Sequence, residues 1–107
     1  MDSIRKVIKA LARKDRIAFK KHSILRMHER RIFADEVKEA LISGEIIEEY
    51  PKDRPLPSCL MLGHTVEQRP IHAVVAVDEG ESMLWVITVY IPTGEEWAEG
   101  FKRRKGQ

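Results

Sequence analysis

The spacing of apolar residues changes once along the chain, near residue 44, and this change constrains the fold more than any other feature. Before it, apolar residues recur every three or four positions, as on one face of an α-helix. After it, runs rich in Val, Ile, Leu and Thr alternate with short polar or Pro- and Gly-containing segments, which is typical of strands and hairpins. The sequence therefore predicts an α+β protein whose helices precede its sheet.

Helices are expected at about 3–14, 21–30 and 35–43, with a short extended piece at 17–19 between the first two. Strands are expected at about 45–50, 58–66, 70–78 and 82–91. A loop with three prolines, residues 51–57, separates the first two strands, and the later connections are short enough for hairpins. We therefore expect a four-stranded antiparallel meander.

A chain of 107 residues has room for one domain, which we place at 1–101, followed by a basic and flexible tail at 102–107. No apolar run approaches the roughly 18 residues of a membrane-spanning helix, and no secretory signal is recognisable. The single cysteine, Cys59, excludes an internal disulfide framework. These features predict a cytoplasmic protein with no membrane partner.

The formal net charge of +2 is unevenly distributed. Residues 1–31 contain 11 Lys and Arg against 3 Asp and Glu, whereas residues 32–101 contain 4 against 14. A basic segment of this kind can provide a phosphate-binding face, although many charge runs are only solvated surface. The chain is thus expected to have a basic head, an acidic body and a basic tail.

The second predicted helix carries a polar stripe. At 100° per residue, His22, Arg26, Glu29 and Arg30 fall on one side of it. Imidazole exchanges protons near neutral pH, and guanidinium binds phosphate through two parallel hydrogen bonds. The same spacing also suits an exposed helix face on which Glu29 pairs with a neighbouring arginine.

A histidine, His72, interrupts an apolar strand. If the following hairpin is centred on Gly80, His72 lies opposite Thr88. This register places Tyr90 on the same face and Trp85 on the other, and a slip of one residue would reverse the assignment. The alternative is a structural histidine, hydrogen-bonded inside the sheet or at its edge.

Metal and cofactor sites are not expected. The four histidines form no His-Glu-x-x-His pair, Cys59 has no second thiol beside it, and no glycine-rich phosphate loop is present. We therefore predict chemistry, if any, that needs no cofactor.

An ordered set of short motifs resembles a bacterial family of small proteins, the domain of unknown function 4258, over about residues 17–104. The motifs are His22-x-x-x-Arg26-Met27-x-x-Arg30, Glu36-Val37-x-x-Ala40-Leu41-x-x-Gly44-Glu45-Ile46-Ile47-Glu48-x-Tyr50-Pro51, Pro57-Ser58-Cys59-Leu60, Pro70-Ile71-His72-Ala73-Val74, Val86-Ile87-Thr88-Val89-Tyr90-x-Pro92 and Trp97. One departure is Phe33, at a position where the family tends to carry a Ser or Thr helix cap.

That family is similar in outline to RelE-like messenger-RNA interferases and to barnase-like and colicin-type nucleases. The resemblance implies N-terminal helices, a curved four-stranded antiparallel sheet, and RNA lying over the sheet. The positions that match its polar residues are His22, Arg26, Arg30, His72, Thr88 and Tyr90.

The function expected on these grounds is metal-independent cleavage of RNA by a toxin-like endonuclease, in which the 2′-hydroxyl of RNA is the nucleophile. His22 and His72 would exchange the protons and Arg26 would stabilise the phosphate, so these three are the predicted catalytic residues. Arg30, Thr88 and Tyr90 would bind the substrate. The alternatives are a non-catalytic module that binds RNA or protein, and the protein-binding member of a toxin–antitoxin pair.

Overall fold

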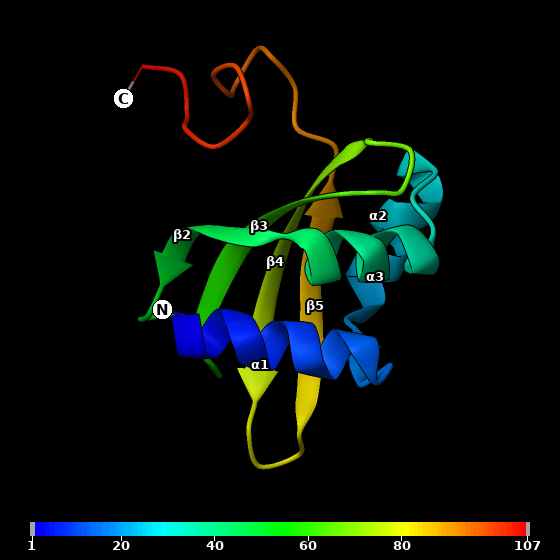
Figure 1. The fold of residues 1–107 in the computed structure, drawn as a ribbon, viewed down its shortest axis with the longest axis vertical. Coiled ribbons are helices and arrows are strands. Elements are labelled where there is room, and N and C mark those ends of the chain that lie inside the picture. Colours follow the sequence, from blue (N-terminus) through cyan, green and yellow to red (C-terminus); the bar gives the residue numbers. More distant parts are fainter. Residues whose placement is uncertain (1, 107) are drawn as a thin grey trace.

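The computed structural model describes residues 2–106 and has three helices and a five-stranded sheet (Figure 1). In chain order the elements are α1 (Asp2–Arg13), β1 (Ile17–Phe19), α2 (Lys21–Arg30), α3 (Ala34–Ser43), β2 (Glu45–Tyr50), β3 (Ser58–His64), β4 (Pro70–Asp78) and β5 (Met83–Tyr90). The helices and the last four strands begin and end within two residues of the predicted positions. The α+β composition therefore follows the sequence pattern.

The predicted four-stranded antiparallel meander is wrong, because the sheet is mixed and has a fifth strand. Its order is β1-β5-β4-β3-β2, and the short piece predicted at 17–19 is the edge strand β1, parallel to β5. Backbone bonds extend this pairing at both ends, from Leu84 N–H to Arg16 O and from Lys20 N–H to Val86 O. Three residues are too few to show a strand period, and the partner strand lies near the other end of the sequence.

The predicted register between β4 and β5 is wrong by two residues. His72 lies opposite Tyr90 and Val74 opposite Thr88, whereas the predicted partner of His72 was Thr88. Side chains alternate between faces along a strand, so a shift of two residues leaves each side chain on its predicted face. His72, Thr88 and Tyr90 therefore share one face as expected.

A β-bulge at Ile87, the β5 residue left unpaired where the register shifts between Val74 and Val75, changes the faces of the β5 residues that precede it. Past the bulge, Val75 lies opposite Val86 and Ala76 opposite Trp85. Val86 is completely buried in the helix-covered core, so Trp85 points to the other face of the sheet. This position is opposite to the predicted one, and the bulge is the physical reason.

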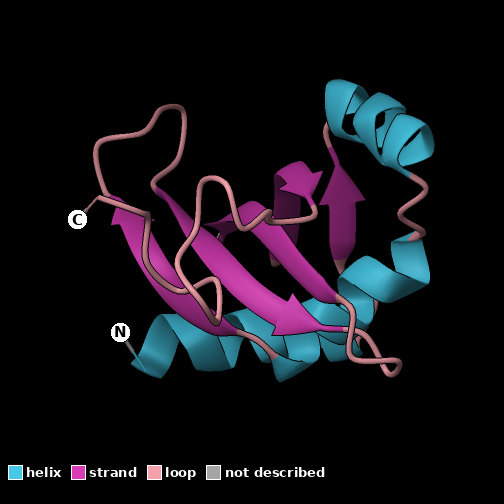
Figure 2. Ribbon diagram, turned by 90° about the horizontal axis from the view of Figure 1, so that it is seen from above, coloured by secondary structure: helices cyan, strands magenta, loops and turns pink. Residues whose placement is uncertain are grey.

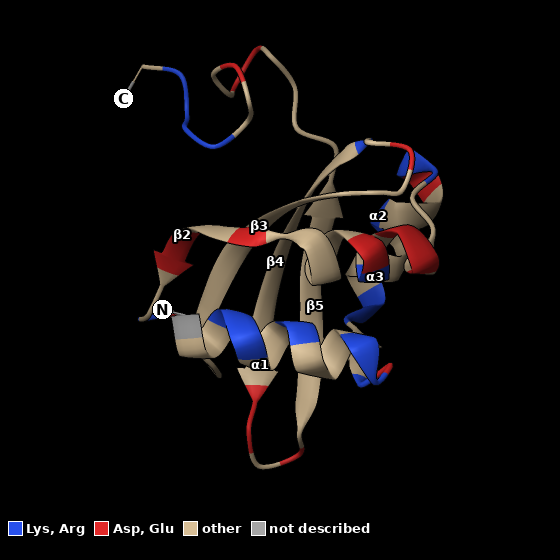
Figure 3. Ribbon diagram, in the orientation of Figure 1, with Lys and Arg blue, Asp and Glu red and all other residues tan. Residues whose placement is uncertain are grey.

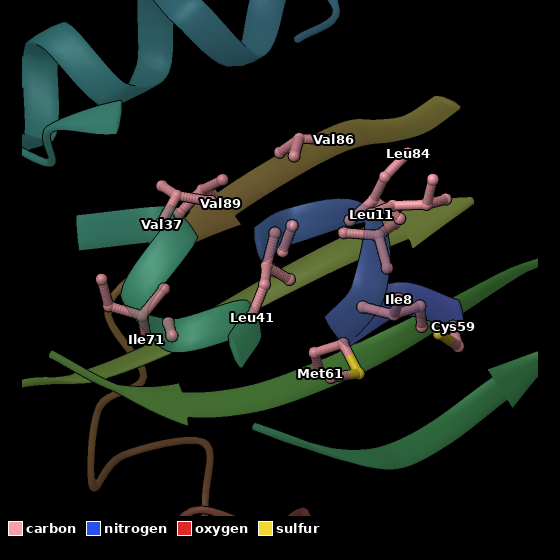
Figure 4. Packing of buried hydrophobic residues seen from close by; sticks show 14 of the residues in the cluster. Ile8, Leu11, Val37, Leu41, Cys59, Met61, Ile71, Leu84, Val86 and Val89 are labelled. Carbon is pink, nitrogen blue, oxygen red and sulfur yellow. The ribbon is translucent and has the colours of Figure 1, made fainter. Parts of the chain in front are cut away.

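The main core lies between the sheet and the helices α1 and α3, which cover one of its faces (Figures 1 and 4). Seen from above, α1 runs along this face, whereas α2 lies beyond the β1 edge of the sheet (Figure 2). Ile8, Leu41 and Val86 are 0% exposed. Helix α3 approaches the sheet at Gly63, where an added Cβ would lie only 1.8 Å from Ala40 O. Only glycine fits at this contact.

The C-terminal segment, residues 91–106, crosses one end of the outer face of the sheet, the face that α1 and α3 leave uncovered. Trp97 is 2% exposed there. Lys102 Nζ lies 2.9 Å from Glu45 Oε1, and Arg104 pairs with Glu48, so two residues of the predicted tail contact β2. The flexibility expected for 102–107 stays a prediction, and Gln107 lies outside the described residues.

Candidate functional site

Two of the predicted residues, His72 and Tyr90, are in direct contact at the end of the sheet where β4 begins and β5 ends. His72 is 0% exposed, although it is on the outer face. Its Nδ1 lies 3.0 Å from the Tyr90 hydroxyl, and its Nε2 lies 2.9 Å from the backbone oxygen of Phe101. Both ring nitrogens therefore have hydrogen-bond partners, as expected for a buried imidazole.

These partners fix the direction of each hydrogen bond. A carbonyl oxygen only accepts, so Nε2 of His72 carries a proton and donates it to Phe101 O. In the neutral ring Nδ1 then accepts, and the Tyr90 hydroxyl donates. Burial lowers the pKa of His72, while the bond to Phe101 and the Glu48 charge partly oppose this effect. Burial also raises the pKa of Tyr90. The pair is therefore neutral at pH 7.

Aromatic contacts hold the imidazole in this orientation. Trp97 meets the His72 ring edge to face, with centroids 4.4 Å apart, and the Tyr90 ring lies at 5.1 Å. The Arg104 guanidinium lies over Trp97, 4.7 Å from the ring centroid. The C-terminal segment thus seals His72 from solvent. Of the two hydrogen-bond partners of His72, Tyr90 also lines an adjoining groove.

An open groove of about 520 Å³ lies beside this pair. It is lined by Arg30, Tyr90, Ile91, Glu96, Trp97 and Arg104. Arg30 is anchored by a 2.7 Å bond from Nη1 to Val89 O. A guanidinium has five N–H donors, so this one bond leaves donors that can bind a ligand. We call this feature the Tyr90 groove.

Arg104, the second guanidinium of the Tyr90 groove, is already paired. Its Nε and Nη2 donate to the two carboxylate oxygens of Glu48 at 2.9 and 3.1 Å. These bonds lower the pKa of Glu48 and raise that of Arg104. The Tyr50 hydroxyl also donates to Glu48, and burial together with this carboxylate raises the pKa of Tyr50 to about 12. Arg30 is therefore the better candidate for contact with an anion.

His22 and Arg26 lie apart from the Tyr90 groove. Both are exposed on α2, and Arg26 Nη1 lies 3.6 Å from Glu29 Oε1, which is the ion pair considered as the alternative for this stripe. His22 precedes Arg30 by eight positions, or about 12 Å along the helix axis. Because His72 is sealed as well, the two histidines do not face one common phosphate.

Thr88 lies nearer to the groove. It is half-buried on the outer face, opposite Val74 and two residues before Tyr90. Glu48, Glu96 and Arg104 contribute to the groove or its ion pair but were not predicted from the sequence. Each is one charged residue among many, and Glu48 and Arg104 are remote from one another in sequence.

Other kinds of site have little support in residues 2–106. Within this range no group of three His, Cys, Asp or Glu side chains is placed to hold a metal ion. Burial raises the pKa of the Cys59 thiol to about 11, so the residue is a protonated, inert thiol at pH 7. None of the described helices has the length and apolar character needed to cross a membrane.

Comparison with known proteins places the chain in one family. No curated protein and no solved structure matches it, and the likeness to RelE-like and barnase-like nucleases is not confirmed. The model of the family described as "Domain of unknown function (DUF4258)" matches residues 19–91, which contain α2, α3 and β2 to β5. Half of the groove lining, Arg30, Tyr90 and Ile91, lies inside this range, whereas Glu96, Trp97 and Arg104 follow it. The chain belongs to the DUF4258 family.

Proposed function

We propose that the protein is a metal-independent endoribonuclease that binds an RNA phosphate in the Tyr90 groove. One observation carries this proposal. Tyr90 lines an open groove together with Arg30, and its hydroxyl is hydrogen-bonded to a sealed, neutral histidine that can accept its proton. A proton relay next to an anion-binding guanidinium is what cleavage through the 2′-hydroxyl requires.

In the proposed reaction, Tyr90 is the catalytic residue and His72 is a positioning residue behind it. The Tyr90 oxygen takes the proton of the RNA 2′-hydroxyl as its own proton passes to Nδ1 of His72. The 2′-oxygen forms a bond to phosphorus, the bond from phosphorus to the 5′-oxygen breaks, and the 5′-oxygen takes a proton from water. The products are a 2′,3′-cyclic phosphate and a 5′-hydroxyl, and His72 then returns its proton through Tyr90 to solvent.

Charges around the relay support this chemistry. Arg30 stabilises the negative charge that accumulates on the phosphate oxygens. The Phe101 carbonyl and the Glu48 carboxylate stabilise the transient imidazolium of His72. His22 and Arg26, with the other cations of the basic head, would hold flanking phosphates and make binding salt-dependent. Thr88, on the outer face two residues before Tyr90, would bind the substrate through its hydroxyl. In this proposal the enzyme acts in the cytoplasm, as a toxin-like nuclease.

The test is cleavage of an end-labelled RNA by purified protein in the presence of a chelator. Tyr90→Phe keeps the ring and removes the hydroxyl, so cleavage should fall by about 100-fold or more. Leu25→Ala, an exposed position on α2 at 65% exposure, is the matched control and should cleave as the parent protein does. Equal activity of Tyr90→Phe and the parent would show that the cleavage does not come from this site.

A second candidate, a non-catalytic RNA-binding module, is favoured by the complete sealing of His72. Both of its nitrogens are hydrogen-bonded and the ring has no exposed surface, which also suits a purely structural role. The same assay separates the two functions. A binding module would shift labelled RNA in a gel and leave it intact at high protein concentration, and Arg30→Ala would weaken the shift.

A further inference from the structure

A second cavity, of about 380 Å³, lies on the outer face of the sheet at the other end of β5. Its lining includes Trp85 and Ile87 of β5, Ala76 of β4, and Pro55 and Leu56 of the loop that follows β2. The cavity therefore offers an aromatic ring together with aliphatic side chains, and we call it the Trp85 slot.

Trp85 occupies this position only because of the β-bulge. The bulge turns it away from the helix-covered core and onto the outer face, where it is half-buried. The ammonium of Lys20 lies 4.6 Å from the centroid of the Trp85 ring, and Arg54 is also at the slot. An aromatic ring beside two cations is the combination that proteins use to bind single-stranded nucleic acids.

We propose that the Trp85 slot binds a nucleobase of a single-stranded RNA whose scissile phosphate lies in the Tyr90 groove. This inference rests on the proposed function and names its substrate class. Trp85 precedes Tyr90 by five positions on the same strand, or about 17 Å at strand spacing. A stacked strand of roughly five nucleotides spans that distance. The slot therefore extends the site from one phosphate to a segment of RNA.

The charges around the slot favour a base inside it and phosphate at its rim. Two carboxylates, Asp53 and Asp78, line the slot and would repel a phosphate. Carboxylate oxygens accept hydrogen bonds from the amino groups of bases. Lys20 is exposed, so its ammonium can leave the Trp85 ring and bind a phosphate when a base takes its place. This exchange is favourable, because stacking of a base on an aromatic ring is stronger than an exposed cation–π contact.

The experiment measures fluorescence anisotropy of two labelled probes whose 2′-hydroxyls are replaced by hydrogen, so that neither is cleaved. One is a single strand of about ten nucleotides, which reaches both sites, and the other is a dinucleotide, which fills only the groove. Trp85→Ala should weaken binding of the long probe by about 5- to 100-fold and leave the dinucleotide unchanged. Trp85→Phe keeps an aromatic face and should retain most of the affinity.

Lys20→Gln is a second variant that does not depend on the packing of Trp85. It should weaken binding of the long probe but not of the dinucleotide, and it should reduce the salt dependence of long-probe binding. Phe33→Ala, 69% exposed and on neither site, is the control. If Trp85→Ala and Lys20→Gln bind the long probe as the parent does while Arg30→Ala binds it less tightly, the proposed binding of a base in the slot is wrong and the proposed function stands. If the parent protein binds neither probe, the proposed function and the role of the slot are both wrong.

Discussion

The two faces of the β-sheet are covered in different ways. The face under α1 and α3 is packed with aliphatic side chains such as Leu41 and Val86, which have no exposed surface. The outer face is covered at one end by the C-terminal segment, which contributes Trp97, and there a buried histidine is hydrogen-bonded to a tyrosine that faces a groove. The first face is packed mainly by apolar contacts, whereas the second contains polar groups that need specific partners.

The helix-covered face is therefore the main source of stability, whereas the outer face contains the candidate site. Aliphatic packing contributes most of the stabilisation of a small domain, because it removes apolar surface from water. The charges are distributed unevenly as well, with cations along the outer side of α1 and acidic residues on β2, on α3 and around the β4–β5 hairpin (Figure 3). Substitutions on the two faces should therefore have different consequences.

The largest effect on stability is expected at the closest contact on the helix-covered face. Gly63→Ala would place a Cβ 1.8 Å from Ala40 O, so α3 must move away from the sheet. We expect a loss of about 3 kcal/mol or more in the free energy of unfolding, because backbone atoms cannot adapt as a flexible side chain does. Thermal unfolding should shift down by about 12 °C or more.

Gly94→Ala is the matched control from the C-terminal segment that crosses the outer face. No atom lies within 4 Å of a Cβ added there, so the change in stability should stay within about 0.5 kcal/mol. Equal unfolding temperatures for the two variants would mean that α3 does not pack on Gly63 as described.

A smaller effect, with a distinctive pH dependence, is expected at His72 on the outer face. Its pKa in the folded protein is lowered from 6.5, chiefly by burial, so the unfolded chain binds a proton first as the pH falls. The free energy of unfolding should therefore decrease between pH 7 and pH 5, with a slope from this one group of at most about 1.4 kcal/mol per pH unit. Urea titrations at several pH values measure the slope.

His72→Phe removes this titration and should reduce the slope. The variant also leaves the Tyr90 hydroxyl and the Phe101 carbonyl without their partner, so stability at pH 7 should drop by about 2 kcal/mol. Leu25→Ala, at an exposed position without a titratable group, should keep the slope of the parent protein. A His72→Phe slope as steep as that of the parent would show that other groups cause the pH dependence.

The sequence predicted what depends on local spacing. The spacing of apolar residues, with periods of 3.6 and 2 residues, predicted three helices and four strands. The alternation of side chains along β4 and β5 predicted that His72, Thr88 and Tyr90 share one face. These features depend on neighbours within a few positions. They therefore appear in a single sequence without any knowledge of the tertiary structure.

The features that the sequence did not predict depend on contacts between remote segments. Strand β1 has three residues and is ordered by pairing with β5, and the position of Trp85 follows from a bulge that has no composition signal. The sealing of His72 needs Phe101 and Trp97, which lie more than twenty positions later. The proton transfer predicted for His22 and His72 requires the two side chains to lie close together, which depends on how α2 packs on the sheet. In the structure His22 is exposed on α2, whereas His72 is sealed under the C-terminal segment.

The smallest effect in this comparison is expected for the ion pairs that attach the C-terminal segment to β2. Arg104→Ala removes two hydrogen bonds to Glu48, whose side chain is 23% exposed, and the contact with Trp97, so it should cost about 1 kcal/mol. Lys102→Ala removes only the pair with Glu45, in which the side chains are 61% and 43% exposed, and should cost less than about 0.5 kcal/mol.

Chemical denaturation with urea at low and high salt distinguishes the two ion pairs. Added salt should weaken the exposed Lys102 pair most, because mobile ions screen exposed charges more than partly buried ones. Arg104→Lys should recover only part of the loss, since an ammonium cannot reproduce the two parallel bonds of the guanidinium. An Arg104→Ala variant as stable as the parent would mean that the other contacts of the segment, among them the packing of Trp97 and the bond from His72 to Phe101 O, hold it over His72 without this ion pair.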